Sequence, residues 1–239
     1  MAVVEAVRLH RHAGEAELVQ ALVPLLVQAV EAARASGGLV LLSGGSTPVP
    51  AYRALALQVR DWSGVTLALV DERRVADDDA GSNARMLRDA LGAGEPGGPA
   101  FWPLIHYPRP LAEDLAAANA RFRAATAHAT PALVLLGMGE DGHTASLFPG
   151  SADLPAALRS AEAYAALDAS GCPGAQSWPQ RLSLTPAGWK AARRRLLVLR
   201  GAKKRAVLDA ALQGEDALAL PVRSAIAIGD APLDVHWCP

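Results

Sequence analysis

The chain has 239 residues, of which 51% are hydrophobic and 20% charged, and its net charge is −1. This balance provides no basic surface for nucleic acid or an anionic membrane, so we expect neither as a partner. The two cysteines form no CxxC pair, which favours a reduced, cytoplasmic compartment. Glu5 and Arg8 interrupt the first apolar residues, so no signal peptide is predicted, and the uncharged stretch 18–30 is too short and polar to span a bilayer.

Strand-like and helix-like patterns alternate along the chain. In chain order, we predict a strand at 3–9, a helix at 15–36 that starts or kinks at Pro24 and ends at Gly37, a strand at 39–42, a helix at 48–60, a strand at 65–70, a helix at 83–91, a strand at 101–105, a helix at 111–128, strands at 133–136, 182–184 and 196–199, a helix at 203–212 and a strand at 225–228. This alternation predicts a single α/β domain over residues 1–239. We expect a three-layer α/β/α sandwich around a mostly parallel, Rossmann-like sheet.

A small, hydroxyl-rich turn follows the predicted strand 39–42. It consists of Ser43, Gly44, Gly45, Ser46 and Thr47, and a helix comes next. Exposed N–H groups at such a helix start can bind a phosphate. The same residues could equally be a turn with Ser46 or Thr47 as the helix N-cap. No lysine follows the glycines, so this is not a nucleotide-binding Walker loop.

Charged residues follow the next predicted strand. Asp71, Glu72 and Arg73 come directly after Val70. At the carboxyl end of a parallel strand they fit the rim of an active site, although a solvated loop would have the same composition.

The segment 137–150, GMGEDGHTASLFPG, comes after the apolar run 132–136 and contains the strongest candidate catalytic residues. Its glycines allow a ligand close to the backbone, and it delivers Asp141 and His143 to the carboxyl end of a strand. Histidine titrates near neutral pH, so His143 is the candidate general base. By letter, GMGEDG also matches the dinucleotide fingerprint GxGxxG, with Glu162 as its acidic residue.

Three segments together resemble the 6-phosphogluconolactonase family, which shares its fold with the glucosamine-6-phosphate isomerase/deaminases. They are SGGSTP at 43–48, DER at 71–73 and GMGEDGHTASLFPG at 137–150, and the resemblance extends to about Leu212. It implies hydrolysis of 6-phospho-D-glucono-1,5-lactone to 6-phospho-D-gluconate, in the oxidative pentose phosphate pathway. The chain departs from the family pattern after Val235, where members usually continue into a last short helix, and this leaves the final edge element open.

The resemblance also implies roles for individual residues. His143 matches the catalytic base, Arg73 lies beside the reacting sugar, and Asn83 helps to position the substrate. Either Asp141 or Asp71 would orient the imidazole. The phosphate would be held by the loop Ser43, Gly44, Gly45, Ser46 and Thr47 together with Arg181 and Lys203. No metal and no cofactor are expected, because the histidines have no metal-ligand spacing and a δ-lactone is an activated ester.

Three other functions remain as alternatives. In a glucosamine-6-phosphate deaminase, a glutamate would stand where this chain has Phe148 and an aromatic residue where it has Arg73. A nucleotide-dependent oxidoreductase would use the GxGxxG match, although that motif normally occupies the first strand–helix turn. A non-catalytic sugar-phosphate sensor could use the same loop but would not need both Arg73 and His143.

Overall fold

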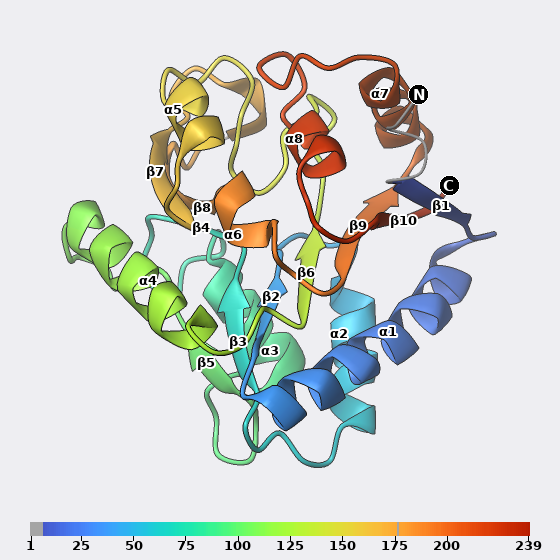
Figure 1. Cartoon of the computed structure of the whole chain (residues 1–239), viewed down its shortest axis with the longest axis vertical. Coiled ribbons are helices and arrows are strands. Elements are labelled where there is room, and N and C mark those ends of the chain that lie inside the picture. Colours follow the sequence, from blue (N-terminus) through green and yellow to red (C-terminus); the bar gives the residue numbers. More distant parts are fainter. Residues whose placement is uncertain (1–6, 176) are drawn as a thin grey trace.

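The computed structural model describes residues 7–175 and 177–239. Within them a parallel sheet of seven strands runs through the molecule in the order β1-β10-β9-β6-β2-β3-β5 (Figure 1). Its strands are β1 (Val7–Arg11), β2 (Leu39–Leu42), β3 (Thr66–Leu69), β5 (Ala100–Trp102), β6 (Leu133–Leu136), β9 (Arg195–Arg200) and β10 (Leu233–Cys238). The predicted parallel sheet is therefore confirmed.

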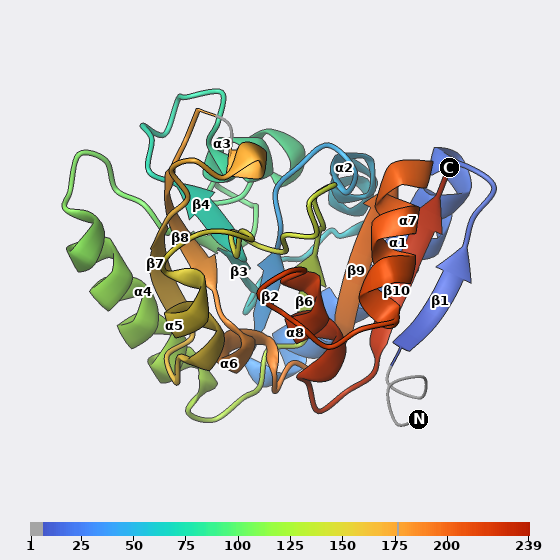
Figure 2. The ribbon, with the colours of Figure 1, turned by 90° about the horizontal axis from the view of Figure 1, so that it is seen from above.

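Helices cover both faces of this sheet. On one face α1 (Glu15–Ser36), α2 (Val49–Gln58) and α3 (Asn83–Leu91) contact one another in sequence. The other side carries α4 (Leu111–Thr126), α6 (Pro186–Trp189), α7 (Ala202–Leu212) and α8 (Val222–Ala227), of which α8 touches both α6 and α7 (Figures 1 and 2). The three-layer α/β/α arrangement is thus the predicted one.

A small antiparallel sheet, which the sequence analysis did not predict, stands beside the main one. It contains β4 (Asp71–Arg73), β8 (Gln180–Leu184) and β7 (Tyr164–Asp168), with α5 (Leu154–Arg159) against β7. The register pairs Arg73 of β4 with Arg181 of β8. The second sheet therefore brings two arginines that are far apart in the sequence to adjacent positions.

Helix α1 runs from Glu15 through Pro24, so the alternative in which the helix starts at Pro24 is wrong. The helix ends as predicted, with Gly37 in the left-handed conformation at φ +66°. By length and composition alone α1 could cross a membrane. Its buried face, which includes Leu18, Leu22 and Leu26, is packed in the hydrophobic core, as expected of a core helix.

Other differences lie at the ends of elements and near the C-terminus. The predicted strand 225–228 is wrong, because these residues lie in and just after helix α8; a short apolar run alone cannot distinguish a buried strand from a helix. Strand β1 covers 7–11 rather than 3–9, whose residues 3–6 lie outside the described part of the chain. The C-terminal residues form β10, an interior strand between β1 and β9.

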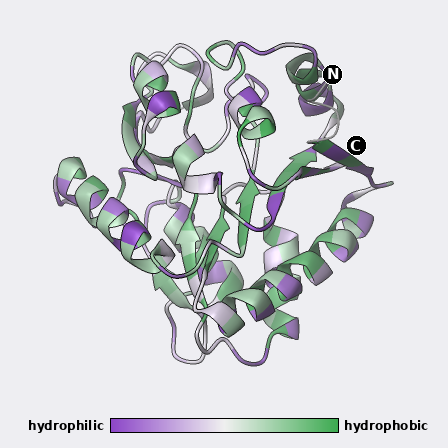
Figure 3. Ribbon diagram, viewed as in Figure 1, coloured by the Kyte–Doolittle hydropathy of each residue, from purple (hydrophilic) through white to green (hydrophobic). Residues whose placement is uncertain are grey.

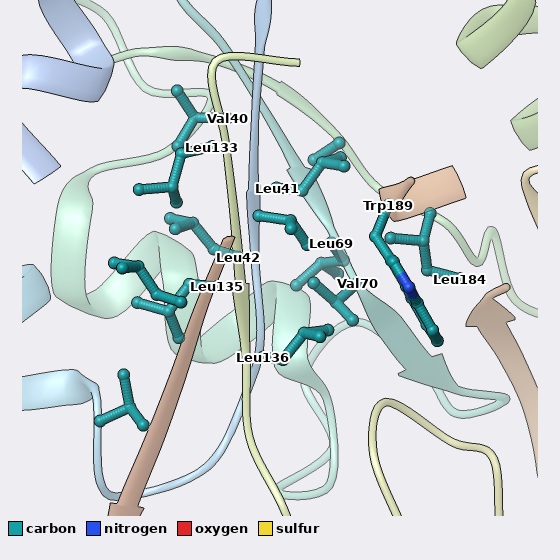
Figure 4. Close-up of a cluster of buried hydrophobic side chains, with 14 of the residues drawn as sticks. Val40, Leu41, Leu42, Leu69, Val70, Leu133, Leu135, Leu136, Leu184 and Trp189 are labelled. Carbon is teal, nitrogen blue, oxygen red and sulfur yellow. The ribbon is translucent and has the colours of Figure 1, made fainter. Parts of the chain in front are cut away.

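The centre of the sheet positions the candidate site. Strands β2 and β6 both read Leu-Val-Leu-Leu, and every residue in them is buried. Figure 3 shows the central strands as hydrophobic and the outer sides of α1 and α4 as partly hydrophilic. In Figure 4 the side chains of these strands pack with Leu69 and Val70, and Trp189 lies against Leu184. This core holds the carboxyl ends of β2 and β6 side by side.

Candidate active site

A cavity of about 260 Å³ opens at the carboxyl ends of β2 and β6. The chain leaves β2 toward α2 on one face of the sheet, whereas the chain after β6 continues on the other face. Loops that diverge from neighbouring strands leave a crevice, which is where open α/β sheets bind their ligands. Both glycine-rich segments line this crevice, together with residues from β4, β8 and α7.

The loop of residues 43–47 forms one wall of the cavity. The Tyr52 hydroxyl of α2 donates to the Ser43 carbonyl at 3.0 Å and fixes the start of the loop. In the described part of the chain, the backbone N–H groups of residues 44–47 donate to no protein acceptor, and the buried Ser43 hydroxyl has no partner. The N-cap of α2 is Pro48, so the alternative in which Ser46 or Thr47 caps the helix is wrong. Unpaired N–H groups and hydroxyls are what an anion requires.

His143 also lines the cavity, and its side chain is paired with that of Asp141. His143 Nδ1 lies 2.5 Å from Asp141 Oδ1, and the same oxygen accepts the His143 backbone N–H at 3.1 Å. Burial alone would raise the pKa of Asp141, but the hydrogen bonds and charge of His143 outweigh it and hold that pKa below its ordinary value. Asp141 is therefore an ionised acceptor, which places the imidazole proton on Nδ1 and leaves Nε2 as the basic nitrogen.

Asp71 is not the group that orients His143. Its Oδ2 accepts a hydrogen bond from the Ser146 hydroxyl at 2.6 Å, and its carbonyl accepts from the Asn83 side chain at 2.8 Å. Of the two aspartates that the sequence left open, Asp141 holds the imidazole, while Asp71 contributes a carboxylate to the cavity lining.

Arg73 is held by a small network at the cavity rim. Its Nη1 donates to Asn83 Oδ1 at 2.6 Å and to the Gly81 carbonyl at 2.8 Å, and its guanidinium lies over the Trp178 ring. Its Nε is buried without a partner among the described residues. Asn83 thus positions Arg73. The loop backbone at Gly44 lies so close to the Asn83 side chain that a Cβ at this position would overlap it, so a glycine is required here.

Arg181 is the most buried cation of the site, with 3% of its surface exposed. Burial, together with the charge of Arg73, lowers the pKa of its guanidinium to about 10, although Asp71 opposes this effect. All three of its nitrogens donate to protein: Nε to the Trp178 carbonyl, Nη2 to the Ala175 carbonyl and Nη1 to Ser146 Oγ at 3.4 Å.

The segment 201–204 (GAKK) holds two neighbouring lysines, and the structure places the second, Lys204, in the site. Lys204 lines the cavity, whereas Lys203 does not: its side chain is 82% exposed and lies 3.7 Å from Glu140. The expected position of Lys203 beside the loop 43–47 is therefore wrong. Successive residues of a helix point about 100° apart, so only one of two neighbouring lysines can face the cavity. Burial lowers the pKa of Lys204, and nearby Arg200 adds to this, whereas Glu140 and Asp141 oppose it.

Glu72 was expected only as one of the charged residues at the end of a strand, and its role as a supporting carboxylate was not predicted. It is buried and accepts the backbone N–H groups of Arg73, Asn83 and Ala84 at 2.7–2.9 Å, at the start of α3. Desolvation raises its pKa to about 7, and those N–H donors oppose the rise. The alternation of β4 could have indicated it, because Glu72 points away from the cavity side that Asp71 and Arg73 share.

No group of three or more potential metal ligands comes together among residues 7–175 and 177–239. The charged groups that line the cavity are the cations Arg73, Arg181 and Lys204 and one carboxylate, Asp71, beside His143. The site therefore has an excess of positive charge, which suits an anionic ligand next to a basic imidazole.

Comparison with known proteins gives consistent matches over nearly the whole chain. The family model for glucosamine-6-phosphate isomerases/6-phosphogluconolactonase matches residues 13–237. A 6-phosphogluconolactonase of Xylella fastidiosa (strain Temecula1) is 46% identical over 214 residues, covering 90% of this chain and 87% of its own. One of Pseudomonas putida is 39% identical over 238 residues, covering 98% and 94%.

Solved structures have the same architecture. A 6-phosphogluconolactonase from Shewanella baltica superposes with a TM-score of 0.82 at 30% identity and covers 98% of each chain. A monomeric glucosamine-6-phosphate deaminase superposes with a TM-score of 0.70 over 97% of each chain, but its 17% identity indicates a shared fold only.

Proposed function

The chain belongs to the glucosamine-6-phosphate isomerase/6-phosphogluconolactonase family, and we propose that it hydrolyses 6-phospho-D-glucono-1,5-lactone to 6-phospho-D-gluconate in the oxidative pentose phosphate pathway. The observation that carries this proposal is the Asp141–His143 pair on the wall of a cation-lined cavity. The near-neutral net charge and the two unpaired cysteines fit a cytoplasmic enzyme with a small phosphorylated substrate and neither nucleic acid nor membrane as partner.

The phosphate of the substrate binds the loop 43–47. Its unpaired N–H groups and the hydroxyls of Ser43, Ser46 and Thr47 provide neutral donors, and Lys204, which lines the same cavity, provides the charge. This arrangement leaves the lactone ring to extend toward His143 and Arg73 on the other cavity walls.

His143 acts as the general base. Nε2 takes a proton from water as the water oxygen attacks the C1 carbonyl, and the carbonyl π electrons move to oxygen. Arg73, whose Nη2 donates to no protein acceptor among the described residues, donates to the resulting oxyanion. As the intermediate collapses, the bond from C1 to the ring oxygen breaks and the imidazolium returns the proton to that oxygen. Asp141 stabilises the imidazolium throughout.

Water rather than a side chain is the nucleophile in this proposal. Ser146, the serine nearest to His143 in the sequence, is fully buried, and its hydroxyl donates to Asp71. A δ-lactone is an activated ester, so attack by water with one general base is sufficient.

The alternatives fit the site less well. Phe148 packs against His143, with ring centroids 4.4 Å apart, at the place where a deaminase would need a proton-carrying glutamate. Glu162, the acidic residue of the dinucleotide fingerprint, instead pairs with Arg123 at the surface. A sugar-phosphate sensor would not require the Asp141–His143 hydrogen bond.

A coupled assay tests the proposal. Glucose-6-phosphate and its dehydrogenase generate the lactone in place at mildly acidic pH, and lactone decay is followed with and without the protein. We expect His143→Ala to slow the enzymatic decay by about 10²–10⁴-fold. His106→Ala is the matched control, because His106 forms a similar pair with Asp114 at 3.1 Å outside the cavity.

Three outcomes decide the matter. Fast decay that His143→Ala abolishes and His106→Ala retains would support both lactonase activity and the base. Decay no faster than the blank would refute the lactonase function, and aminosugar phosphates would be tested next. Decay that survives His143→Ala would keep the function and remove the base.

A further inference from the structure

Arg181 has a hydrogen-bonding pattern that differs from that of the other cations in the cavity lining. Its Nε and Nη2 donate to two backbone carbonyls, those of Trp178 and Ala175, and its Nη1 reaches Ser146 Oγ. We propose that Arg181 is a positioning residue, which clamps the backbone at Ala175 and at Trp178 and the loop after β6 around the Asp141–His143 pair, and that it does not bind the substrate phosphate. This inference rests on the proposed function of the site.

The first arm of the clamp acts through Gly174, which precedes the clamped Ala175 carbonyl. A Cβ at Gly174 would overlap Asp141 Oδ2 and come within 3.0 Å of His143 Nδ1. The backbone therefore lies directly against the pair, on the side of the Asp141–His143 hydrogen bond. By holding the carbonyl of the next residue, Arg181 fixes this wall and keeps water from the bond between the two side chains.

The second arm acts through the loop that carries the histidine. The Arg181 guanidinium lies 5.2 Å from the centroid of the Phe148 ring, and that ring packs against the His143 imidazole. Ser146 lies between His143 and Phe148 in the sequence, and its hydroxyl accepts a hydrogen bond from Arg181 Nη1 and donates one to Asp71. Arg181 thus supports the imidazole from the Phe148 side as well as from the Gly174 side.

A phosphate ligand would find little of Arg181 within reach. Three of its five N–H groups already have protein acceptors, one on each nitrogen, and only 3% of its surface is exposed. Lys204, by contrast, lines the same cavity and has no hydrogen bond to protein among the described residues. The two residues therefore have different roles: Lys204 binds the substrate phosphate, and Arg181 holds the Asp141–His143 pair in place.

The proposal predicts which kinetic constant changes. A residue that only binds the phosphate raises KM, whereas a misplaced general base lowers kcat. We expect Arg181→Lys, which cannot reproduce the planar fork, to lower kcat by about 10²-fold with little change in KM. Gly174→Ala should have the same effect without altering any charge, because its Cβ pushes on Asp141.

The experiment compares Arg181→Lys, Gly174→Ala and Lys204→Met with the unaltered protein. Four quantities are measured: kcat, KM, the pH profile of kcat/KM, and the inhibition constant of inorganic phosphate. Arg195→Lys is a control for lost stability, since Arg195 is a buried arginine that donates to the carbonyls of Ala225, Ile228 and Ala231 outside the cavity.

The expected result is a lower kcat and an altered pH profile for Arg181→Lys and Gly174→Ala, with unchanged phosphate inhibition, whereas Lys204→Met weakens phosphate inhibition. Weaker phosphate inhibition in Arg181→Lys, with kcat retained, would overturn the clamp. The clamp would also be overturned if Arg195→Lys lowered kcat and altered the pH profile as much as Arg181→Lys does.

A measurement that does not depend on turnover separates this inference from the proposed function. Amide hydrogen exchange of residues 170–175 should accelerate in Arg181→Lys and stay unchanged in Lys204→Met. If the protein shows no lactonase activity but this acceleration is seen, the function fails and the clamp stands. Unchanged exchange in Arg181→Lys would refute the clamp whatever the activity.

Discussion

The two neighbouring lysines of α7 allow a test of the phosphate site with a built-in control. Lys204 lines the cavity and is partly desolvated, whereas Lys203 is largely in solvent beside Glu140. Lys204→Met and Lys203→Met remove the same charge from the same helix turn and keep a side chain of similar length. Any difference between the two variants therefore reports the position of the charge and not the net charge of the protein.

The size of the effect follows from the kind of bond that is lost. A hydrogen bond to a charged group contributes about 1.5–3 kcal/mol, and about 1.4 kcal/mol corresponds to a tenfold change in an equilibrium constant. Lys204→Met should therefore raise KM about 10- to 100-fold. Because the phosphate is remote from C1, the interaction is equally strong in the ground and transition states, and kcat should change little. Lys203→Met should behave as the unaltered protein, since ion pairs as exposed as its pair with Glu140 contribute little.

The coupled lactone assay gives KM and kcat, and calorimetric titration with the stable product, 6-phosphogluconate, gives the affinity directly. The lowered pKa of Lys204 adds a pH test: product affinity should fall on the alkaline side at a lower pH than an ordinary lysine would give, and Lys204→Met should lack this fall. An increase in KM for Lys203→Met as large as that for Lys204→Met would refute the placement of the phosphate. So would a lower kcat with unchanged KM in Lys204→Met.

Three further predictions concern the base, the rim and stability. Asp141→Asn should lower kcat about 10²–10⁴-fold, measured in the coupled assay, because an amide NH₂ can turn the His143 proton to the wrong nitrogen; retained activity would remove Asp141 from the mechanism. Gly44→Ala should lower kcat/KM about 10²-fold, because the new Cβ displaces Asn83 and hence Arg73. Circular dichroism should show the fold intact, and unchanged kinetics would contradict the prediction. Burial and two neighbouring imidazoles lower the pKa of His236 from 6.5 to about 4, so the folded state binds this proton less well than the unfolded state. Its contribution to stability is present above pH 6.5 and is lost, by about 3 kcal/mol, as the pH falls toward 4. Urea unfolding at pH 7 and pH 4.5 should therefore show a smaller loss of unfolding free energy for His236→Gln than for the unaltered protein, and an equal loss in both would refute the prediction.

The sequence predicted the elements whose patterns are local. The buried runs of β2 and β6, the helix between Glu15 and its glycine end, and the turns that follow the two strands were all placed correctly. The antiparallel sheet could not be found in this way. Strand β4 has three residues and β7 comes from a distant segment, so only their pairing with β8 makes them strands. The run 225–228 was misassigned for a related reason, because packing against α6 and α7 makes it part of a helix.

The site was predictable where one short motif holds both partners and unpredictable where a contact spans the fold. Asp141 and His143 are two residues apart, so their hydrogen bond lies within a single turn. The choice of Lys204 over Lys203 depends on the rotation of α7 relative to a loop more than 150 residues earlier, and no local pattern records that rotation. The role of Glu72 was missed because its three backbone donors belong partly to α3, which folds back onto β4.

The acceptors around each cation separate residues that a sequence motif treats alike. Arg73 and Arg181 are adjacent in the register of β4 and β8, and both line the cavity. Arg73 is only partly buried and its Nη2 donates to no protein acceptor among the described residues, so it can still donate to charge that develops on a substrate. Arg181 has an acceptor on every nitrogen and only 3% of its surface exposed, so its two remaining N–H groups offer a new ligand little access. A ligand that displaced one of the existing bonds to a buried carbonyl would leave that carbonyl unsatisfied, at a cost of about 1–3 kcal/mol. Two arginines at neighbouring positions therefore have different roles: Arg73 contacts the substrate, and Arg181 positions the residues that contact it.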